Sequence, residues 1–284
     1  MSANDWVMGG AFYDTTAGRI FYRDEGSGPV VVLFHGFPTW SYDWAEIVPA
    51  LSSHRRVITL DFPGYGFSEK RRGVDFSVGG SANAVEQLLA HLGITNAALA
   101  IHDFGGIVGQ ELLDRRRHGR LPFAIDGIHV LNCGIVYAAY RPTQIQKLLA
   151  LPAMGAVVAS QITKEKLLIG LNAVRGPRKL EAAEFDELWT GIGRDDGHKL
   201  AHRHIRYNAE RAVHHERWES ALFDYDGPLQ LIWGLLDPVS GKHVLDLARP
   251  RLSNARIVEL SEAGHFPQSE APQEVAAAIR GAFG

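Results

Sequence analysis

Ile101-His-Asp-Phe-Gly-Gly106 is the stretch of sequence that decides the fold. It directly follows the apolar run Ala97–Ile101 and directly precedes a helical pattern of apolar residues between positions 107 and 113. Where a strand turns sharply into a helix, one side chain is pushed out of the turn, and small residues beside it relieve the crowded backbone. The two glycines supply these small residues, so the stretch predicts a strand–turn–helix elbow that exposes Asp103.

The role of Asp103 stays open as long as this motif stands alone. An aspartate at a strand-to-helix junction is often a helix N-cap, whose carboxylate accepts hydrogen bonds from the amides of the first turn. The position two residues earlier also holds Ile101, where the common serine form of the elbow has glycine. The alternative role is that of a carboxylate nucleophile. The motifs that follow the other predicted strands distinguish the N-cap role from the nucleophile role.

Similar apolar runs recur along the chain and alternate with helical patterns. We expect an N-terminal hairpin at Ala11–Asp14 and Arg19–Arg23, and later strands at Val30–Phe34, Arg56–Leu60, Ala97–Ile101, Gly127–Leu131, Leu229–Trp233 and Arg256–Leu260. A helical pattern ends at Leu92 before Gly93, and a last helix carries Val275, Ile279 and Phe283. This alternation is typical of the α/β class and predicts a mostly parallel eight-stranded sheet with helices on both faces.

The alternation stops between about Asn132 and Asp226, where the sequence is rich in helical patterns and has no clear strand. We therefore expect a core domain formed by residues 1–131 and 227–284, with residues 132–226 inserted as a helical cap domain. Open α/β sheets bind ligands at the carboxyl ends of their strands. A cap inserted after a strand is in a position to close over such a site.

Three further motifs follow predicted strands. His35-Gly-Phe-Pro38 comes after the first buried run, Trp233-Gly-Leu-Leu-Asp-Pro238 after a later one, and Glu262-Ala-Gly-His-Phe-Pro267 after the last. In the α/β-hydrolase fold the nucleophile, acid and base occur in this chain order, and the amides after the nucleophile and in the first loop form the oxyanion hole. The sequence thus predicts a catalytic triad and an oxyanion hole, which consist of Asp103, Asp237 and His265, and of the N–H groups of Phe37 and Phe104.

Several polar residues are interpreted as structural. Asp61, in Asp61-Phe-Pro-Gly-Tyr-Gly-Phe-Ser68, is expected to accept hydrogen bonds from nearby backbone amides, and Cys133 to be a small buried packing residue. Four histidines lack the cysteines or suitably spaced carboxylates of a metal site and are expected to face solvent: His202, His204, His214 and His215.

The composition excludes some classes of partner. Lys and Arg total 29 against 32 Asp and Glu, which gives a formal net charge of -3 and no basic field for nucleic acid or an anionic membrane. The single cysteine and the absence of a signal-peptide pattern favour a reducing, cytoplasmic location. We expect a monomer or homodimer that acts on a small molecule and uses neither metal nor organic cofactor.

The motifs quoted above, together with His35-Gly-Phe-Pro-Thr-Trp-Ser-Tyr-Asp-Trp44, resemble the epoxide hydrolase and haloalkane dehalogenase branch of the α/β-hydrolases. Within that branch the chain is similar to the mesoderm-specific transcript family, including the stretch Glu187–Gly197 in the expected cap. The resemblance covers roughly residues 15 to 275 and implies a two-step reaction. Asp103 would form an alkyl ester with the substrate, and a water activated by His265 would hydrolyse it.

The resemblance leaves the substrate open between an epoxide and a carbon–halogen compound. Dehalogenases of this branch usually hold the halide with Asn and Trp side chains at the positions that are Phe37 and Phe104 here, and neither phenyl ring has an N–H donor. Epoxide hydrolases usually place two cap tyrosines over the nucleophile. Tyr207 stands 30 residues before Asp237 (237 minus 207), where the second of them is expected.

The first cap tyrosine has no clear counterpart, because Tyr137 and Tyr140 lie early in the expected cap. Epoxide hydrolysis is therefore favoured, and dehalogenation is the alternative. A non-catalytic binding protein with a hydrolase fold has less support, since such a protein does not need an acid and a base at these spacings. The candidate substrate-binding residues are His35, Trp40, Tyr137 and Trp189.

Overall fold

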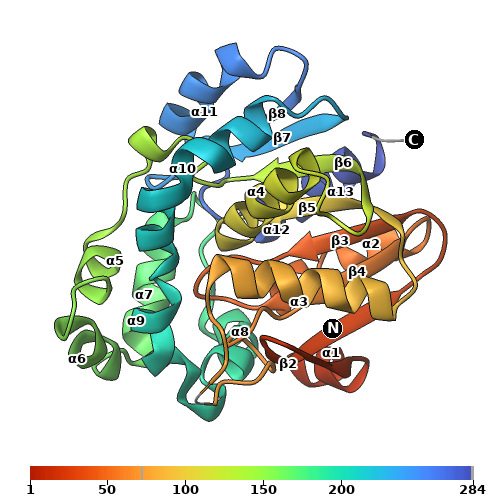
Figure 1. The fold of residues 1–284 in the computed structure, drawn as a ribbon. Helices are drawn as coiled ribbons and strands as arrows, with labels where there is room; N and C mark the ends of the chain where they lie inside the picture. Colours follow the sequence, from red (N-terminus) through yellow and green to blue (C-terminus); the bar gives the residue numbers. More distant parts are fainter. Residues whose placement is uncertain (72, 283–284) are drawn as a thin grey trace.

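The apolar runs form one sheet in the computed structural model, which describes residues 1–71 and 73–282 (Figure 1). Its eight strands lie in the order β1-β2-β4-β3-β5-β6-β7-β8. Only the pairs β1–β2 and β2–β4 are antiparallel. The strands are β1 Ala11–Thr15, β2 Gly18–Glu25, β3 Val30–Phe34, β4 Arg56–Leu60, β5 Asn96–His102, β6 Ala124–Leu131, β7 Leu229–Gly234 and β8 Arg256–Leu260. The expected mostly parallel eight-stranded sheet is confirmed.

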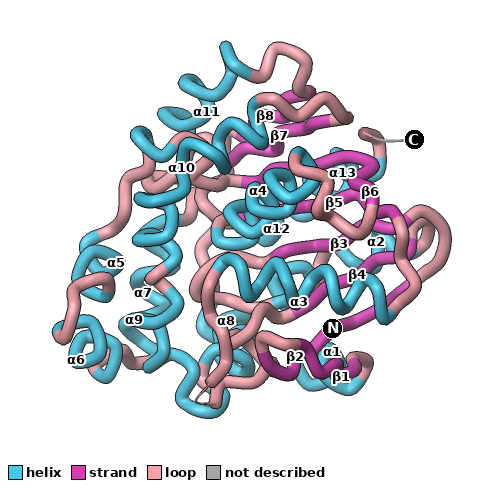
Figure 2. Tube along the Cα trace, in the orientation of Figure 1, coloured by secondary structure: helices cyan, strands magenta, loops and turns pink. Residues whose placement is uncertain are grey.

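Helices cover both faces of the sheet because its inner strands alternate their side chains between two cores. In β3, Val32 and Phe34 belong to one buried cluster, while Val31 and Leu33 belong to the other. The first core is covered by α3 Val78–His91, α4 Phe104–Arg117, α10 Tyr207–Phe223 and α11 Lys242–Ala248. The second is covered by α1 Ala3–Met8, α2 Val48–Ser52, α8 Ala182–Ile192 and α13 Pro272–Arg280. Figure 2 shows the strands between these helices, with α3 and α4 in front.

The chain between β6 and β7 contains no strand among its described residues. After the 3₁₀ turn Tyr137–Ala139 it forms α5 Gln144–Leu149, α6 Met154–Ser160, α7 Lys164–Val174, α8, a 3₁₀ segment Arg194–Leu200, α9 Ala201–His204 and α10. In Figure 1 these helices, coloured green to teal, run along one end of the sheet. The helix-rich character expected for this segment is found, and its independence as a cap domain stays a prediction.

Some elements differ from the expectation. Helix α1 was not predicted, although Ser2 and Asp5 form the capping box that starts it. Helix α3 ends at His91, so Leu92 is its C-cap and not its last turn. Phe283, expected on the last helix, lies outside the described residues. No helix in the described part of the chain has the length and apolar run that crossing a bilayer requires.

Candidate active site

The elbow lies where the sequence places it. Strand β5 ends at His102, α4 begins at Phe104, and Asp103 between them adopts φ 46° and ψ −112°. Such a backbone conformation in a residue other than glycine costs about 1–3 kcal/mol. A side chain at Gly105 would come within 2.6 Å of the Phe34 Cβ atom, so only glycine lets α4 leave this close to β3.

The carboxylate of Asp103 does not act as a helix cap, since its side chain makes no capping hydrogen bond. Its Oδ1 atom accepts a hydrogen bond from the Phe37 N–H at 2.8 Å, and its Oδ2 atom lies 3.5 Å from the Nε2 atom of His265. The N-cap alternative is therefore removed. The carboxylate instead faces a histidine on one side and a backbone donor on the other.

His265 and Asp237 complete a buried chain of polar groups. The Nδ1 atom of His265 donates to the Oδ2 atom of Asp237 at 2.8 Å, which fixes the imidazole orientation because a carboxylate can only accept. Asp103, Asp237 and His265 are 5%, 3% and 4% exposed, so bulk water screens this chain of charges weakly. The structure thus brings together the three residues of the predicted triad.

Asp237 is held by a residue that the sequence analysis missed. Asn132, directly after β6, donates through Nδ2 to the Oδ2 atom of Asp237 at 3.1 Å, and its Oδ1 atom accepts from the Gly234 N–H at 2.6 Å. Ser240 Oγ and the Val239 N–H also donate to Asp237, at 2.9 and 2.7 Å. The sequence feature that could have identified Asn132 is its position as the first residue after a predicted strand.

The predicted oxyanion loop is locked by His35. Its Nε2 atom accepts from the Phe62 N–H at 3.1 Å, and its Nδ1 atom donates to the Gly36 carbonyl oxygen at 2.9 Å. Burial lowers the pKa of His35 to about 3, so the ring is neutral and structural. The second predicted donor, the Phe104 N–H, is the first amide of α4, which has no acceptor within the helix.

The charges of the triad are strongly coupled. Burial opposes a charge on His265, but Asp237 and the hydrogen bonds to Asp103 and Asp237 outweigh it and raise the pKa of His265 to about 10. Burial likewise opposes a charge on Asp103, and the hydrogen bond and charge of His265 hold the pKa of Asp103 below its usual value. The free protein thus carries an ionised Asp103 beside a protonated His265.

This coupling leads to a prediction about titration. In Asp103→Asn, one carboxylate charge beside the imidazole is lost, so the pKa of His265 should fall well below the value of about 10 in the native protein. The stabilisation from protonated His265 is complete below pH 6.5 and is lost as the pH rises through about 10 in the native protein. In the variant this loss should occur at lower pH.

NMR titration of the His265 ring, with unfolding curves at several pH values, measures both effects. His129, which is buried on β6 and bonds to Gln230, provides an internal control whose titration should not move. Equal midpoints for His265 in the native protein and Asp103→Asn would show that the two side chains do not interact.

Three tyrosines, Tyr207, Tyr140 and Tyr65, lie near Asp103. Tyr207 is buried, packs against the Phe104 ring at 5.2 Å between centroids, and its hydroxyl has no hydrogen-bond partner among the described residues. Tyr140 lies close enough to Tyr207 and Asp103 for both to affect its pKa, which burial raises to about 12. The Tyr65 hydroxyl is also buried without a partner, and its ring stacks on Phe104. Tyr140 was considered too early in the sequence, and only the fold brings it here.

The four predicted substrate-binding residues lie apart from the triad. His35 serves the oxyanion loop, and Trp40 is fully buried and donates its ring N–H to the Leu188 carbonyl oxygen at 2.9 Å. Tyr137 stacks on His215 at 4.5 Å, and Trp189 packs against His198 at 4.9 Å. Trp189 thereby contacts His198, and His35 packs against Tyr65 at 5.1 Å, and both of these partners line a cavity beside the site. Their roles in substrate binding remain predictions.

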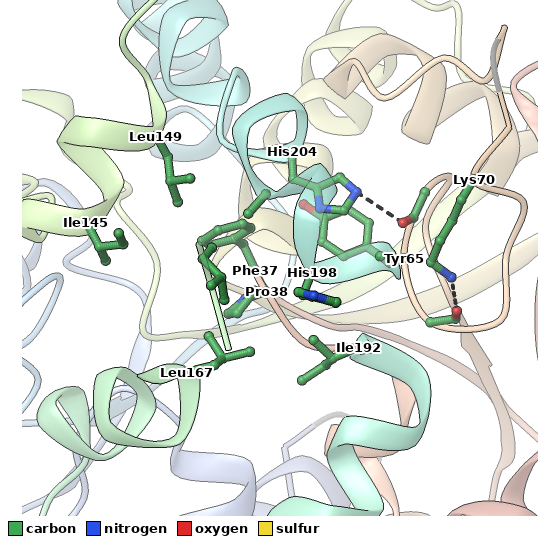
Figure 3. A pocket seen from close by; sticks show the side chains of 15 residues that line it. Phe37, Pro38, Tyr65, Lys70, Ile145, Leu149, Leu167, Ile192, His198 and His204 are labelled. Carbon is green, nitrogen blue, oxygen red and sulfur yellow. Dashed lines mark hydrogen bonds between the residues drawn. The ribbon is translucent and has the colours of Figure 1, made fainter. Parts of the chain in front are cut away.

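Two cavities meet at Phe37 and Pro38. One has a volume of about 240 Å³, reaches His265, and is lined by residues of α5 and α7, many of them aliphatic. The other, of about 60 Å³, extends past Tyr65 to His198 and Lys70. Figure 3 shows this second cavity, with the side chains of Leu149, Leu167 and Ile192 around it. The described residues contain no group of three or more His, Cys, Asp or Glu side chains that could hold a metal ion.

The structural interpretations of Asp61 and Cys133 are confirmed, whereas His202, His214 and His215 are half-buried and not fully in solvent. Asp61 accepts from the amides of Ser41 and Phe67 at 2.8 and 2.7 Å, and Cys133 is fully buried. The interpretation of His204 was wrong. It is buried, stacks on Tyr65 at 4.1 Å, and bonds to the Gly64 carbonyl oxygen at 3.0 Å, because the helical segment folds back over the sheet at this point.

Comparison with known proteins places this geometry in a family. The sequence profile of the alpha/beta hydrolase fold family matches residues 29–272. The hydrolase LipZ of Mycobacterium tuberculosis is 36% identical over 98% of this chain and 96% of its own length. The mesoderm-specific transcript homolog protein of Homo sapiens is 37% identical over 95% of this chain and 84% of its own.

More distant similarity extends to dehalogenases and to solved structures. Haloalkane dehalogenase 2 of Mycobacterium tuberculosis is 26% identical over 96% of this chain and 94% of its own length. The crystal structure of Cfl2 from Burkholderia cenocepacia superposes with a TM-score of 0.80 at 21% identity, over 97% of this chain and 95% of that one, and it supports the fold alone. The match to the family profile and the relatives above 30% identity show that this chain is a hydrolase of the α/β-hydrolase fold family.

Proposed function

We propose that the protein is an epoxide hydrolase that converts apolar epoxides to vicinal diols through an ester on Asp103. The observation that carries the proposal is the Tyr207 hydroxyl, which is buried beside the nucleophile and next to the Tyr140 hydroxyl, and which makes no hydrogen bond of normal geometry among the described residues. A buried polar group without a hydrogen bond costs about 1–3 kcal/mol. An epoxide oxygen bound next to Asp103 would supply the missing acceptor.

The first step uses the Oδ2 atom of the nucleophile. Oδ1 of Asp103 is held by the Phe37 N–H at 2.8 Å, whereas Oδ2 has the longer contact of 3.5 Å to His265, so Oδ2 attacks the epoxide carbon and the carbon–oxygen bond of the ring breaks. Burial and the charge of Asp103 raise the pKa of Tyr207 well above that of a free phenol, so its hydroxyl is protonated and can donate to the developing alkoxide. The products of this step are an ester, a hydroxyl group and a tyrosinate.

The second step needs His265 as a base. Ester formation removes the negative charge of Asp103, so the pKa of His265 falls and the imidazole can lose its proton. Neutral His265 then takes a proton from a water that attacks the ester carbonyl, and the Phe37 N–H stabilises the oxyanion on Oδ1. The first proton that His265 loses restores the Tyr207 hydroxyl. Breakage of the acyl–oxygen bond then releases the diol, whose oxygen takes the proton that His265 received from water, and the proton left on the Asp103 carboxyl returns to His265.

The substrate class follows from the two cavities. Aliphatic side chains such as Ile145 and Leu167 line both cavities, and the two cavities meet at Phe37 beside the nucleophile. An epoxide with apolar substituents on one or both ring carbons would fill this space by burying apolar surface. Small, strongly polar epoxides would not.

Replacement of Tyr207 tests the proposal. Tyr207→Phe should lower the turnover of an aliphatic epoxide by roughly 10²–10⁴-fold, the usual contribution of a positioned acid, with little change in binding. Tyr140 accepts from Asn208 at 3.4 Å and keeps its own O–H to donate, so Tyr140→Phe should also lower the rate, and the double variant should be the slowest. Steady-state rates and single-turnover ester formation measure the effect.

Tyr13→Phe is the matched control, since Tyr13 stacks on His91 at the far edge of the sheet. An unchanged epoxide rate in Tyr207→Phe would remove this hydroxyl from the mechanism. A native protein that ignores epoxides but releases halide from haloalkanes would replace the proposal by its alternative.

That alternative, haloalkane dehalogenase, is favoured by the relative of that name. Halide binding needs N–H donors, and four of the six tryptophans use their ring N–H elsewhere in the fold. Trp189, against His198 beside the second cavity, is the tryptophan best placed to serve. Halide release that is lost in Trp189→Phe and kept in Tyr207→Phe would support dehalogenation.

A further inference from the structure

The backbone around His265 is held by a buried carboxylate outside the triad. Glu270, the last residue of helix α12 Pro267–Glu270, is 9% exposed. Its Oε2 atom accepts from the Gly264 N–H at 2.8 Å, and its Oε1 atom accepts from the Phe266 N–H at 2.9 Å. One side chain therefore binds the amides on both sides of His265.

The same carboxylate reaches the helical segment. Its Oε2 atom also accepts from the Gly176 N–H at 2.7 Å, in the turn between α7 and α8. The turn contacts the histidine directly as well, because the His265 N–H donates to the Val174 carbonyl oxygen at 3.0 Å. Residues 174–176 and 264–266 thus form one hydrogen-bonded unit with Glu270 at its centre.

The two backbones touch closely enough to exclude side chains. A Cβ atom on Gly176 would lie 2.4 Å from the Glu262 carbonyl oxygen, and one on Gly264 would lie 2.5 Å from the Gly176 nitrogen. Glycine at these positions lets the turn lie against the histidine loop. On the opposite side, His102 donates to the His265 carbonyl oxygen at 2.7 Å and accepts from Gln268 at 3.1 Å.

We propose that Glu270 is a positioning residue, which sets the distance between His265 and Asp103 and links the α7–α8 turn to the base. Hydrogen bonds to a carboxylate are roughly twice as strong as neutral ones, so three of them hold the loop firmly. The inference rests on the two-step reaction proposed above. Attack by Asp103 does not need a base, whereas ester hydrolysis needs His265 aligned with a water.

Glu270→Gln tests this assignment. Glutamine keeps the size of the side chain, but its NH₂ group faces N–H donors, so at least one of the three amides loses its acceptor. A misplacement of about 1 Å costs roughly 10²-fold in rate, so ester hydrolysis should slow by up to that factor. Ester formation should stay close to the native rate, and covalent adduct should accumulate during turnover.

Glu274→Gln is the matched control, because Glu274 is an exposed acid in the first turn of α13. Gly176→Ala provides a second variant, which pushes the turn away while Glu270 stays intact, and it should slow the same step. The proposal would be overturned if Glu270→Gln slowed ester formation and ester hydrolysis equally, and if this loss of rate matched a fall in the unfolding midpoint. Glu270 would then have only a general structural role.

Hydrogen exchange gives a readout that needs no substrate. Glu270→Gln should speed amide exchange in residues 174–176 and 264–266 together, and Glu274→Gln should change neither segment. Unchanged exchange in both segments would overturn the link. If the native protein forms no ester with epoxides or haloalkanes, the proposed function fails, and the exchange measurement alone decides on Glu270.

Discussion

Asp103→Ala is expected to lower turnover of every substrate by on the order of 10⁴–10⁶-fold, the range seen when one member of a catalytic triad is removed. No other carboxylate can take its place. Asp61 uses its oxygens for the amides of Ser41 and Phe67, and Asp43 is bonded to Thr39. Without Asp103 there is no group to form the ester, and the two-step route is closed.

Asp103→Ser should not restore activity, which separates a carboxylate from a serine mechanism. Attack by a serine oxygen on an sp³ carbon yields an ether, which His265 and water cannot hydrolyse, whereas a carboxylate yields an ester. Asp126→Ala, at an exposed position of β6, controls for the loss of one acidic residue. Substantial turnover by Asp103→Ala, with a native unfolding midpoint, would end the carboxylate-nucleophile hypothesis.

The sheet could be predicted because its inner strands carry their own signal. Val30–Phe34 is apolar at every position since both faces of β3 are covered, and its bounds were predicted correctly. Strand β6 begins earlier than expected, at Ala124, because Asp126 is exposed and interrupts the apolar run. Apolar runs thus reveal the buried part of a strand and miss its exposed end.

The residues around the triad depend on long-range packing that no local pattern reports. Tyr140 and Tyr207 are 67 residues apart (207 minus 140), yet the helical segment brings both near Asp103. His204 resembles a surface histidine in sequence, and its contacts with Tyr65 and Gly64, which are distant in the chain, make it a core residue. Asp103, Asp237 and His265 could be found since each directly follows a strand, and the carboxyl ends of parallel strands meet at one edge.

His265→Gln is expected to separate the two chemical steps. Asp103 keeps its Phe37 donor and its position at the elbow, so it can still attack the substrate. Glutamine has no basic nitrogen, so no group takes the proton from the attacking water, and Asn132 and Asp237 cannot replace it because they bind each other. Turnover should fall by on the order of 10⁶-fold while the ester accumulates.

Mass measurement of the intact protein reads this outcome directly, because a trapped ester adds the mass of one substrate molecule. An epoxide adds its whole mass. A haloalkane adds its mass less that of the hydrogen halide, and one halide ion is released, so the adduct also identifies the reaction class. Digestion should locate the added mass on the peptide that contains Asp103. His243→Gln is the control, since His243 is half-buried on α11 and bonds to the Val239 carbonyl oxygen at 3.2 Å. Normal turnover by His265→Gln, or no adduct from a substrate that the native protein consumes, would exclude His265 as the base.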